Sequence, residues 1–287
     1  MIDLFLSILS STLLFVVFKL FGVHKVQALY AIVVNYMVAC MVGLALYDGE
    51  LQFDNIAGTS WFWGTVAMGA LFITIFNLMA KTTRVAGVSV TSVATKMSLA
   101  IPVIFGVILY QEKLSAFQIT GVLLAFVAVY LTSLKERSIA ISKKDLLLPI
   151  LVFLGSGIID TSIKYFEEQH LTSNEVPIFS AMIFGFAALS GCIFIGIRSI
   201  KKPLKINLKN VLGGIALGIP NYFSVYFLVR ALRIEGFGSS AIFTLNNVAV
   251  VLFSTILGIL LFKEKLNLKN WGGVAVALLS IILVALF

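Results

Sequence analysis

Lys96 is the residue whose type and position in this sequence most directly suggest chemistry. It lies in an apolar run at residues 88–110, about eight positions from the start, or roughly 12 Å along a helix axis. A charge at that depth in a membrane is costly and normally faces a cavity or a partner. Ser89 and Ser92 precede it at helical spacing and predict a polar stripe on the same face. Such a cation would bind a carboxylate or phosphate group; the alternative is a structural lysine paired with a backbone carbonyl.

Amide and tyrosine side chains lie within several other apolar runs. They suit the polar face of a small-molecule cavity, although amides in membrane helices also join neighbouring helices. Tyr222 and Tyr226 lie four residues apart and are followed by Arg230. They fit an aromatic belt at the membrane interface equally well. The residues predicted to bind substrate are Lys96, Ser92, Asn35, Asn77, Asn221, Tyr222, Tyr226, Asn246 and Asn247.

Asp160 is a carboxylate inside an apolar run, which makes it a candidate to carry a coupling proton. Lys164 follows four residues later, at the spacing of neighbours on one helix face. Both residues are therefore coupling candidates, and an ordinary ion pair near the helix end is the alternative.

The sequence lacks the residue patterns of several other function classes. There are two cysteines, Cys40 and Cys192, both inside apolar runs, and two histidines, both isolated in loops, so no metal site is predicted. No pair of carboxylates and no nucleophile with a base predicts catalysis, and no GxxxxGK[ST] pattern predicts direct use of ATP. We therefore predict no catalytic residues and no cofactor, and an intramembrane enzyme is the disfavoured class.

Composition identifies the elements that must position these residues. The mean hydropathy is +1.06, and charged residues make up 12% of the chain against about a quarter in soluble domains. Ten apolar runs have the length of a membrane-spanning helix. They cover residues 3–21, 28–46, 61–80, 88–110, 116–133, 146–164, 177–197, 210–229, 239–262 and 270–287. The sequence thus predicts an all-α polytopic membrane protein. Its first apolar run is interpreted as a membrane span rather than a removed signal peptide. Its net charge of +8 is interpreted as a topology signal rather than as a sign of nucleic-acid binding.

The second half of the chain repeats the first. A Glu-Lys-Leu turn between two apolar runs occurs at 112–114 and again at 264–266. The residues matched at an offset of 152 are Gly106 and Gly258, Leu109 and Leu261, and Gly121 and Gly273. We therefore predict a five-helix repeat at 1–133, a linker at 134–145 and a second five-helix repeat at 146–287. Because five is odd, the repeats are inverted, as in many transporters.

Positive charge predicts the orientation. Loops 1, 3, 5, 7 and 9 hold 15 Lys and Arg residues, and loops 2, 4, 6 and 8 hold 3. By the positive-inside rule the odd loops are cytoplasmic and both termini lie outside.

Ten spans in two halves, each with a Glu-Lys-Leu turn before a glycine-bearing last helix, resemble the drug/metabolite transporter superfamily and most closely its EamA-type branch. The resemblance implies a central cavity lined mainly by the third, fourth, eighth and ninth spans. It also implies secondary transport in a bacterial inner membrane, usually export of amino acids or related metabolites. Known members are described with cytoplasmic termini, opposite to the charge bias here.

The resulting hypothesis is a secondary active transporter whose two repeats alternate access to a midplane site. Its partners are a small-molecule substrate, the lipid bilayer and protons as the candidate coupling ion, without nucleic acid, in a monomer or a homodimer. An anion or phosphometabolite exchanger and a multidrug exporter are the alternatives.

Overall fold

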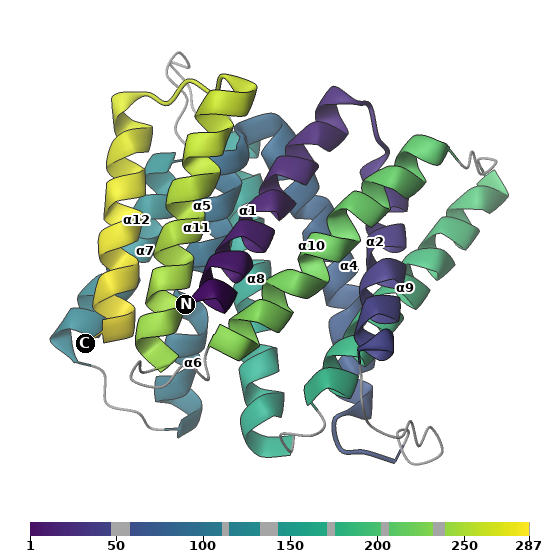
Figure 1. Ribbon diagram of the computed structural model, residues 1–287. Coiled ribbons are helices and arrows are strands. Elements are labelled where there is room, and N and C mark those ends of the chain that lie inside the picture. Colours follow the sequence, from purple (N-terminus) through teal and green to yellow (C-terminus); the bar gives the residue numbers. More distant parts are fainter. Residues whose placement is uncertain are drawn as a thin grey trace.

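The computed structural model describes residues 1–46, 58–110, 115–132, 143–170, 176–201, 207–231 and 239–286. Every regular element in these ranges is a helix (Figure 1). The helices are α1 (Ile2–Val23), α2 (Ala28–Ala45), α4 (Phe62–Ala86), α5 (Val88–Met97), α6 (Ala100–Tyr110), α7 (Ala116–Thr132), α8 (Lys143–His170), α9 (Val176–Lys201), α10 (Leu208–Ala231), α11 (Ser239–Phe262) and α12 (Leu268–Leu286).

The helices have the length and composition of membrane spans. Within the described ranges, eight helical stretches are long and apolar enough to cross a bilayer, and α7 and α12 add two shorter apolar helices. A lipid-exposed backbone must satisfy its own hydrogen bonds, which helices do within one segment. The prediction of an all-α polytopic membrane protein is confirmed, whereas the inverted ten-helix repeat stays a prediction. The first Glu-Lys-Leu turn and nearly all of the 134–145 linker lie outside the described residues.

The fourth predicted span is not one helix but two. It breaks at Ser98 and Leu99, between α5 and α6. Pro102 has no backbone N–H, so the Ser98 carbonyl loses its usual donor four residues later, and the proline ring crowds that carbonyl. Ile101 donates to the Ser98 carbonyl instead, at 2.9 Å. By contrast, α10 continues as a helix through Pro220.

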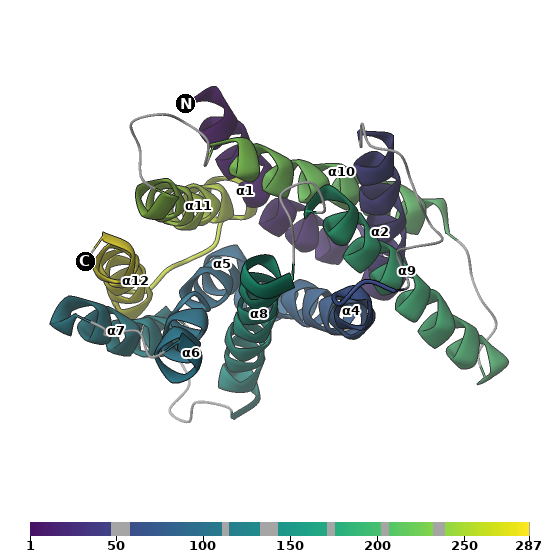
Figure 2. The same ribbon diagram turned by 90° about the horizontal axis from the view of Figure 1, so that it is seen from below.

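Helices far apart in sequence pack side by side. Figures 1 and 2 show α7 beside α12, and α10 beside α1 and α2. The α7–α12 contact depends on the repeated glycines: a Cβ on Gly121 would lie 2.7 Å from Val284, and one on Gly273 would lie 2.7 Å from Thr132. Small residues allow this close approach of two membrane helices. The Ser280 hydroxyl then reaches the Gly121 carbonyl at 2.7 Å.

An aromatic cluster lies at the centre of the bundle. Phe18, Tyr36, Phe72, Phe76 and Phe184 come from α1, α2, α4 and α9, and their rings contact one another edge-on, tilted or stacked. Tyr36 is fully buried, and its hydroxyl donates to the Phe72 carbonyl at 3.0 Å. Phe72, Phe76 and Phe184 of this cluster line the cavity described next.

Candidate functional site

A cavity of about 320 Å³ lies inside the bundle, between α1, α4, α5, α8, α9 and α10. In Figure 2, α1 and α10 lie on the side opposite α8, with α5 on the left and α4 on the right. Each helix contributes one face, as its spacing requires. The lining residues on α4 are Phe72, Ile75, Phe76 and Met79, and those on α8 are Ser156, Ile159, Asp160 and Ile163. The volume lies in the range of small-molecule sites.

Two opposite charges, Lys96 from α5 and Asp160 from α8, line this cavity. They interact electrostatically, and the described residues show no direct ion pair between them. The Ser98 hydroxyl, at the break after α5, donates to Asp160 Oδ2 at 2.9 Å. The Asp160 side chain is exposed to the cavity, and Lys96 is partly buried. The break thus places a hydroxyl donor two residues after the lysine and against the carboxylate.

Neutral polar residues complete the lining, and most of them are not among the residues predicted from the sequence. They are Ser11, Thr95, Ser156, Ser180, Asn221 and Ser224. Helical spacing from a predicted residue would have found two: Ser156 lies four residues before Asp160, and Ser224 lies three after Asn221. Ser11 and Ser180 lie on helices without a predicted cavity residue, so only the packing reveals them.

Several residues predicted to bind substrate lie in helix contacts instead. The Asn221 amide donates to Asn35 Oδ1 at 3.2 Å, which joins α10 to α2, although Asn221 also lines the cavity. Asn246 accepts from the Ser7 hydroxyl at 3.2 Å, which joins α11 to α1. The Ser92 hydroxyl donates to the Ser89 carbonyl of its own helix at 3.0 Å. The first two bonds join neighbouring helices, and the third satisfies a backbone carbonyl within one helix.

The tyrosines stack on each other outside the cavity lining. The rings of Tyr222 and Tyr226 have centroids 5.9 Å apart, and a Cβ on Gly43 of α2 would lie 3.1 Å from the Tyr222 ring. The Tyr226 hydroxyl accepts from Arg230 at 3.3 Å, and Arg230 also lies 3.3 Å from the Asp3 carboxylate. Tyr226 therefore belongs to a cluster near the first turn of α1.

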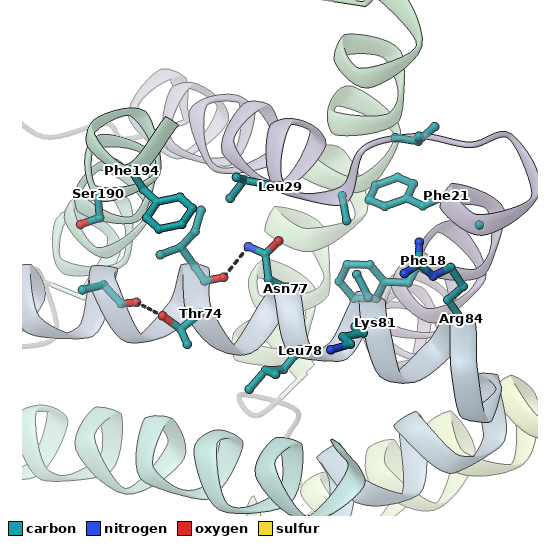
Figure 3. A pocket seen from close by; sticks show the side chains of 16 residues that line it. Phe18, Phe21, Leu29, Thr74, Asn77, Leu78, Lys81, Arg84, Ser190 and Phe194 are labelled. Carbon is teal, nitrogen blue, oxygen red and sulfur yellow. Dashed lines mark hydrogen bonds between the residues drawn. The ribbon is translucent and has the colours of Figure 1, made fainter. Parts of the chain in front are cut away.

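The remaining predicted residues lie elsewhere. Asn77 lines a second cavity, of about 670 Å³, between α1, α2, α4 and α9 (Figure 3). Asn247 is partly buried on α11 and is not among the residues that line either cavity. The ninth span, which the family resemblance implied as a cavity wall, contributes no described residue to the central one. The Lys164 side chain lies outside the described residues.

Glu264 of the second Glu-Lys-Leu turn caps α5, the helix that carries Lys96. Its carboxylate accepts the Val88 backbone N–H at 2.9 and 3.1 Å, and Lys19 Nζ lies 2.8 Å from Oε1. A carboxylate at a helix N-terminus satisfies free N–H groups and the helix dipole. Glu264 thus has a structural, helix-capping role, and its counterpart Glu112 lies outside the described residues.

Comparison with known proteins places the chain in a family. The sequence profile of the EamA-like transporter family matches residues 143–286. A Haemophilus influenzae protein described as uncharacterized is 29% identical over 285 residues, which cover 97% of this chain and 96% of that protein. A crystal structure with 16% sequence identity superposes with a TM-score of 0.60 over 99% of this chain and 96% of the solved one, which shows a shared fold. From the profile match and the apolar helices, this chain is an integral membrane protein that belongs to the EamA-like transporter family.

Proposed function

We propose that the chain is a secondary active transporter that exports a small polar metabolite, an amino acid or a closely related compound, from a bacterial cell through the inner membrane. The observation that carries this proposal is the presence of Lys96 and Asp160 in one cavity inside the membrane-spanning bundle. Charged groups at this depth are expensive and mark substrate or ion pathways.

The two charges fit a zwitterion. The carboxylate group of the substrate binds Lys96, and its ammonium group binds Asp160. The Ser98 hydroxyl donates a hydrogen bond to Asp160 and positions that carboxylate. A phosphometabolite would meet the Asp160 carboxylate and a lipophilic cation would meet Lys96, so the cavity favours neither alternative. The surrounding serines and Asn221 offer neutral hydrogen-bond partners to the remaining polar atoms.

The fold supports alternating access between two inverted repeats, predicted at 1–133 and 146–287. The central cavity is lined by both halves of the chain, which is where such folds bind substrate. Glu264 ties α1 and α5 together at the Val88 end of α5, and these contacts must open when that side opens. Asp160 is the group that would exchange a coupling proton. The unit that transports is a monomer or each protomer of a homodimer.

The test is transport by purified protein in proteoliposomes, across a panel of amino acids and with an imposed pH gradient. We expect transport of at least one amino acid, with a KM that rises by about 10- to 100-fold in Lys96→Met, since a charged hydrogen bond is lost. The matched control is Lys209→Gln, which removes an exposed cation at the start of α10 and should leave KM unchanged.

Asp160→Asn separates substrate binding from coupling. Exchange of substrate across the membrane without a gradient should persist at higher substrate concentration, whereas accumulation driven by the pH gradient should be lost. An unchanged KM in Lys96→Met would refute the site. Hydrolysis or lipid scrambling in place of metabolite transport would refute the function.

A further inference from the structure

The second cavity, which Asn77 lines, is larger than the central cavity that holds Lys96 and Asp160. It measures about 670 Å³ and lies between the C-terminal parts of α1, α4 and α9 and the start of α2. None of its lining residues lines the central cavity, because α4 turns one face to each. The Phe18–Phe76 ring contact, with centroids 5.6 Å apart, lies between them. The larger cavity is therefore a separate site.

A polar stripe runs along the α4 wall of this cavity and ends in two cations. Thr74, Asn77, Lys81 and Arg84 follow helical spacing along one face, and the ten helical steps from Thr74 to Arg84 cover about 15 Å. Figure 3 shows Asn77 midway along the stripe, with its amide nitrogen bonded to the Ile73 carbonyl at 2.8 Å. Within the described residues the Asn77 amide oxygen has no hydrogen-bond donor. Polarity thus increases toward the end of the helix.

The two cations lack acidic partners in the described part of the chain. Lys81 and Arg84 are exposed, and neither forms an ion pair with a described carboxylate. The Arg84 side chain lies against Gly22 at the end of α1, where a Cβ would lie 3.1 Å from Arg84 Cγ. The glycine therefore makes room for the arginine stem at the mouth of the cavity. Two cations without a carboxylate partner among the described residues favour an anionic ligand there.

The other walls are apolar and open toward the membrane. Leu29 of α2, Leu78 of α4 and Phe194 of α9 line them, and Phe194 is 55% exposed (Figure 3). Leu29 and Leu78 are partly buried. Phe194 lies in an apolar span, which places its exposed side chain where a membrane helix meets hydrocarbon. A small soluble anion would bury no apolar surface against such walls, whereas burial of an acyl chain there is favourable.

We propose that this cavity binds an anionic phospholipid of the leaflet that the charge bias assigns to the cytoplasm. The headgroup phosphate lies between Lys81 and Arg84, and an acyl chain lies along Phe194 and Leu29. Basic pockets between membrane helices on the cytoplasmic side recognise anionic headgroups in this way. This site differs from a general electrostatic attraction to the membrane surface, because its two cations line the same cavity as apolar side chains.

Native mass spectrometry of the full chain in detergent tests the proposal. Phosphatidylglycerol or phosphatidylcholine with the same acyl chains is added, and retained lipid is counted. We expect retention of phosphatidylglycerol at least about tenfold above phosphatidylcholine, lost in Lys81→Gln/Arg84→Gln. The matched control, Lys209→Gln/Lys269→Gln, removes two other exposed cations and should retain phosphatidylglycerol as the parent does.

Two further arms identify the ligand. Ala70→Trp fills the apolar part of the cavity without changing charge and should also reduce retention of phosphatidylglycerol. Glycerol phosphate at micromolar concentration should not displace the lipid. If it did, and if Ala70→Trp had no effect on retention, the cavity would be a site for soluble anions and the proposal would be overturned. Equal retention of both lipids, or equal loss in the two double variants, would overturn it as well. Circular dichroism checks that each variant is folded.

Discussion

Lys19 and Glu264 lie near opposite ends of the chain, and their side chains meet at 2.8 Å. The same Glu264 carboxylate accepts the Val88 N–H at the start of α5. One residue therefore holds together α1, the turn between α11 and α12, and the helix that carries Lys96. The side chains of Lys19 and Glu264 are 22% and 11% exposed, so water screens the pair only in part.

Glu264→Gln should lower the free energy of unfolding by about 2 kcal/mol, because a partly buried lysine loses its partner and a helix N-terminus loses a charge. Chemical denaturation in detergent micelles measures the effect. Lys19→Met should cost less, since Glu264 keeps its bonds to the Val88 N–H. The double variant should be more stable than the sum of the single effects predicts, by about 1 kcal/mol. Strict additivity would mean that the pair does not couple.

Gly87→Ala should disrupt the same contact from the backbone side. Gly87 has φ +108° and ψ 169°, a conformation almost restricted to glycine, and a Cβ there would lie 2.9 Å from the Glu264 carboxylate. We expect a loss of about 1–3 kcal/mol in the free energy of unfolding. Gly196→Ala is the matched control: it lies in α9, and beyond its own stretch of helix no described atom lies within 4 Å of its Cβ position, so alanine should be neutral or slightly stabilising. Equal effects at the two positions would contradict this account of Gly87.

Asn35 and Asn221 illustrate what a sequence alone leaves open. Both were predicted to bind substrate, and both readings of an intramembrane amide, cavity or helix contact, fit the sequence. The structure bonds them to each other and gives only Asn221 a place in the cavity lining. The choice depends on how α2 rotates against α10, which is decided by side-chain packing rather than by local pattern.

Asn35→Ala should therefore reduce stability without changing KM. Loss of an interhelical bond between membrane helices costs about 0.6–1.7 kcal/mol. Asn221→Ala should reduce stability similarly and also raise KM, because that side chain reaches the cavity. Unfolding in detergent and transport in proteoliposomes give the two readouts. A raised KM in Asn35→Ala would return Asn35 to the binding site.

Much of the fold was predictable because it rests on composition and periodicity. Long apolar runs predicted membrane helices, and Lys96 was identified because an intramembrane charge is expensive. The break at Ser98 was partly predictable from Pro102, but its consequence, a hydroxyl against Asp160, requires α8 to pack beside α5. The amides Asn246 and Asn247 were predicted because they lie in an apolar run, whereas neither lines the cavity and the charge opposite Lys96 comes from α8.

Ser98→Ala tests that consequence. The hydroxyl donates to Asp160 Oδ2 at 2.9 Å, so its removal leaves the carboxylate less firmly positioned. We expect KM for the transported amino acid to rise about fivefold, the equivalent of one hydrogen bond, with coupling to the pH gradient retained. Ser98→Thr keeps the hydroxyl and should restore most of the affinity. If Ser98→Ala abolished gradient-driven accumulation as Asp160→Asn does, the serine would itself take part in coupling.

Orientation in the membrane is the last prediction, and the two arguments for it conflict. The odd loops carry 15 Lys and Arg residues against 3 in the even loops, which predicts termini outside the cytoplasm. Figure 1 shows both termini in the lower half of the view, which agrees with the even number of spans predicted from the sequence. A phosphatase that is active only outside the cytoplasm should therefore be active when fused to the C-terminus and inactive within 134–142. The reverse pattern would show that the family orientation holds, and it would assign Glu264, Lys81 and Arg84 to the outer side.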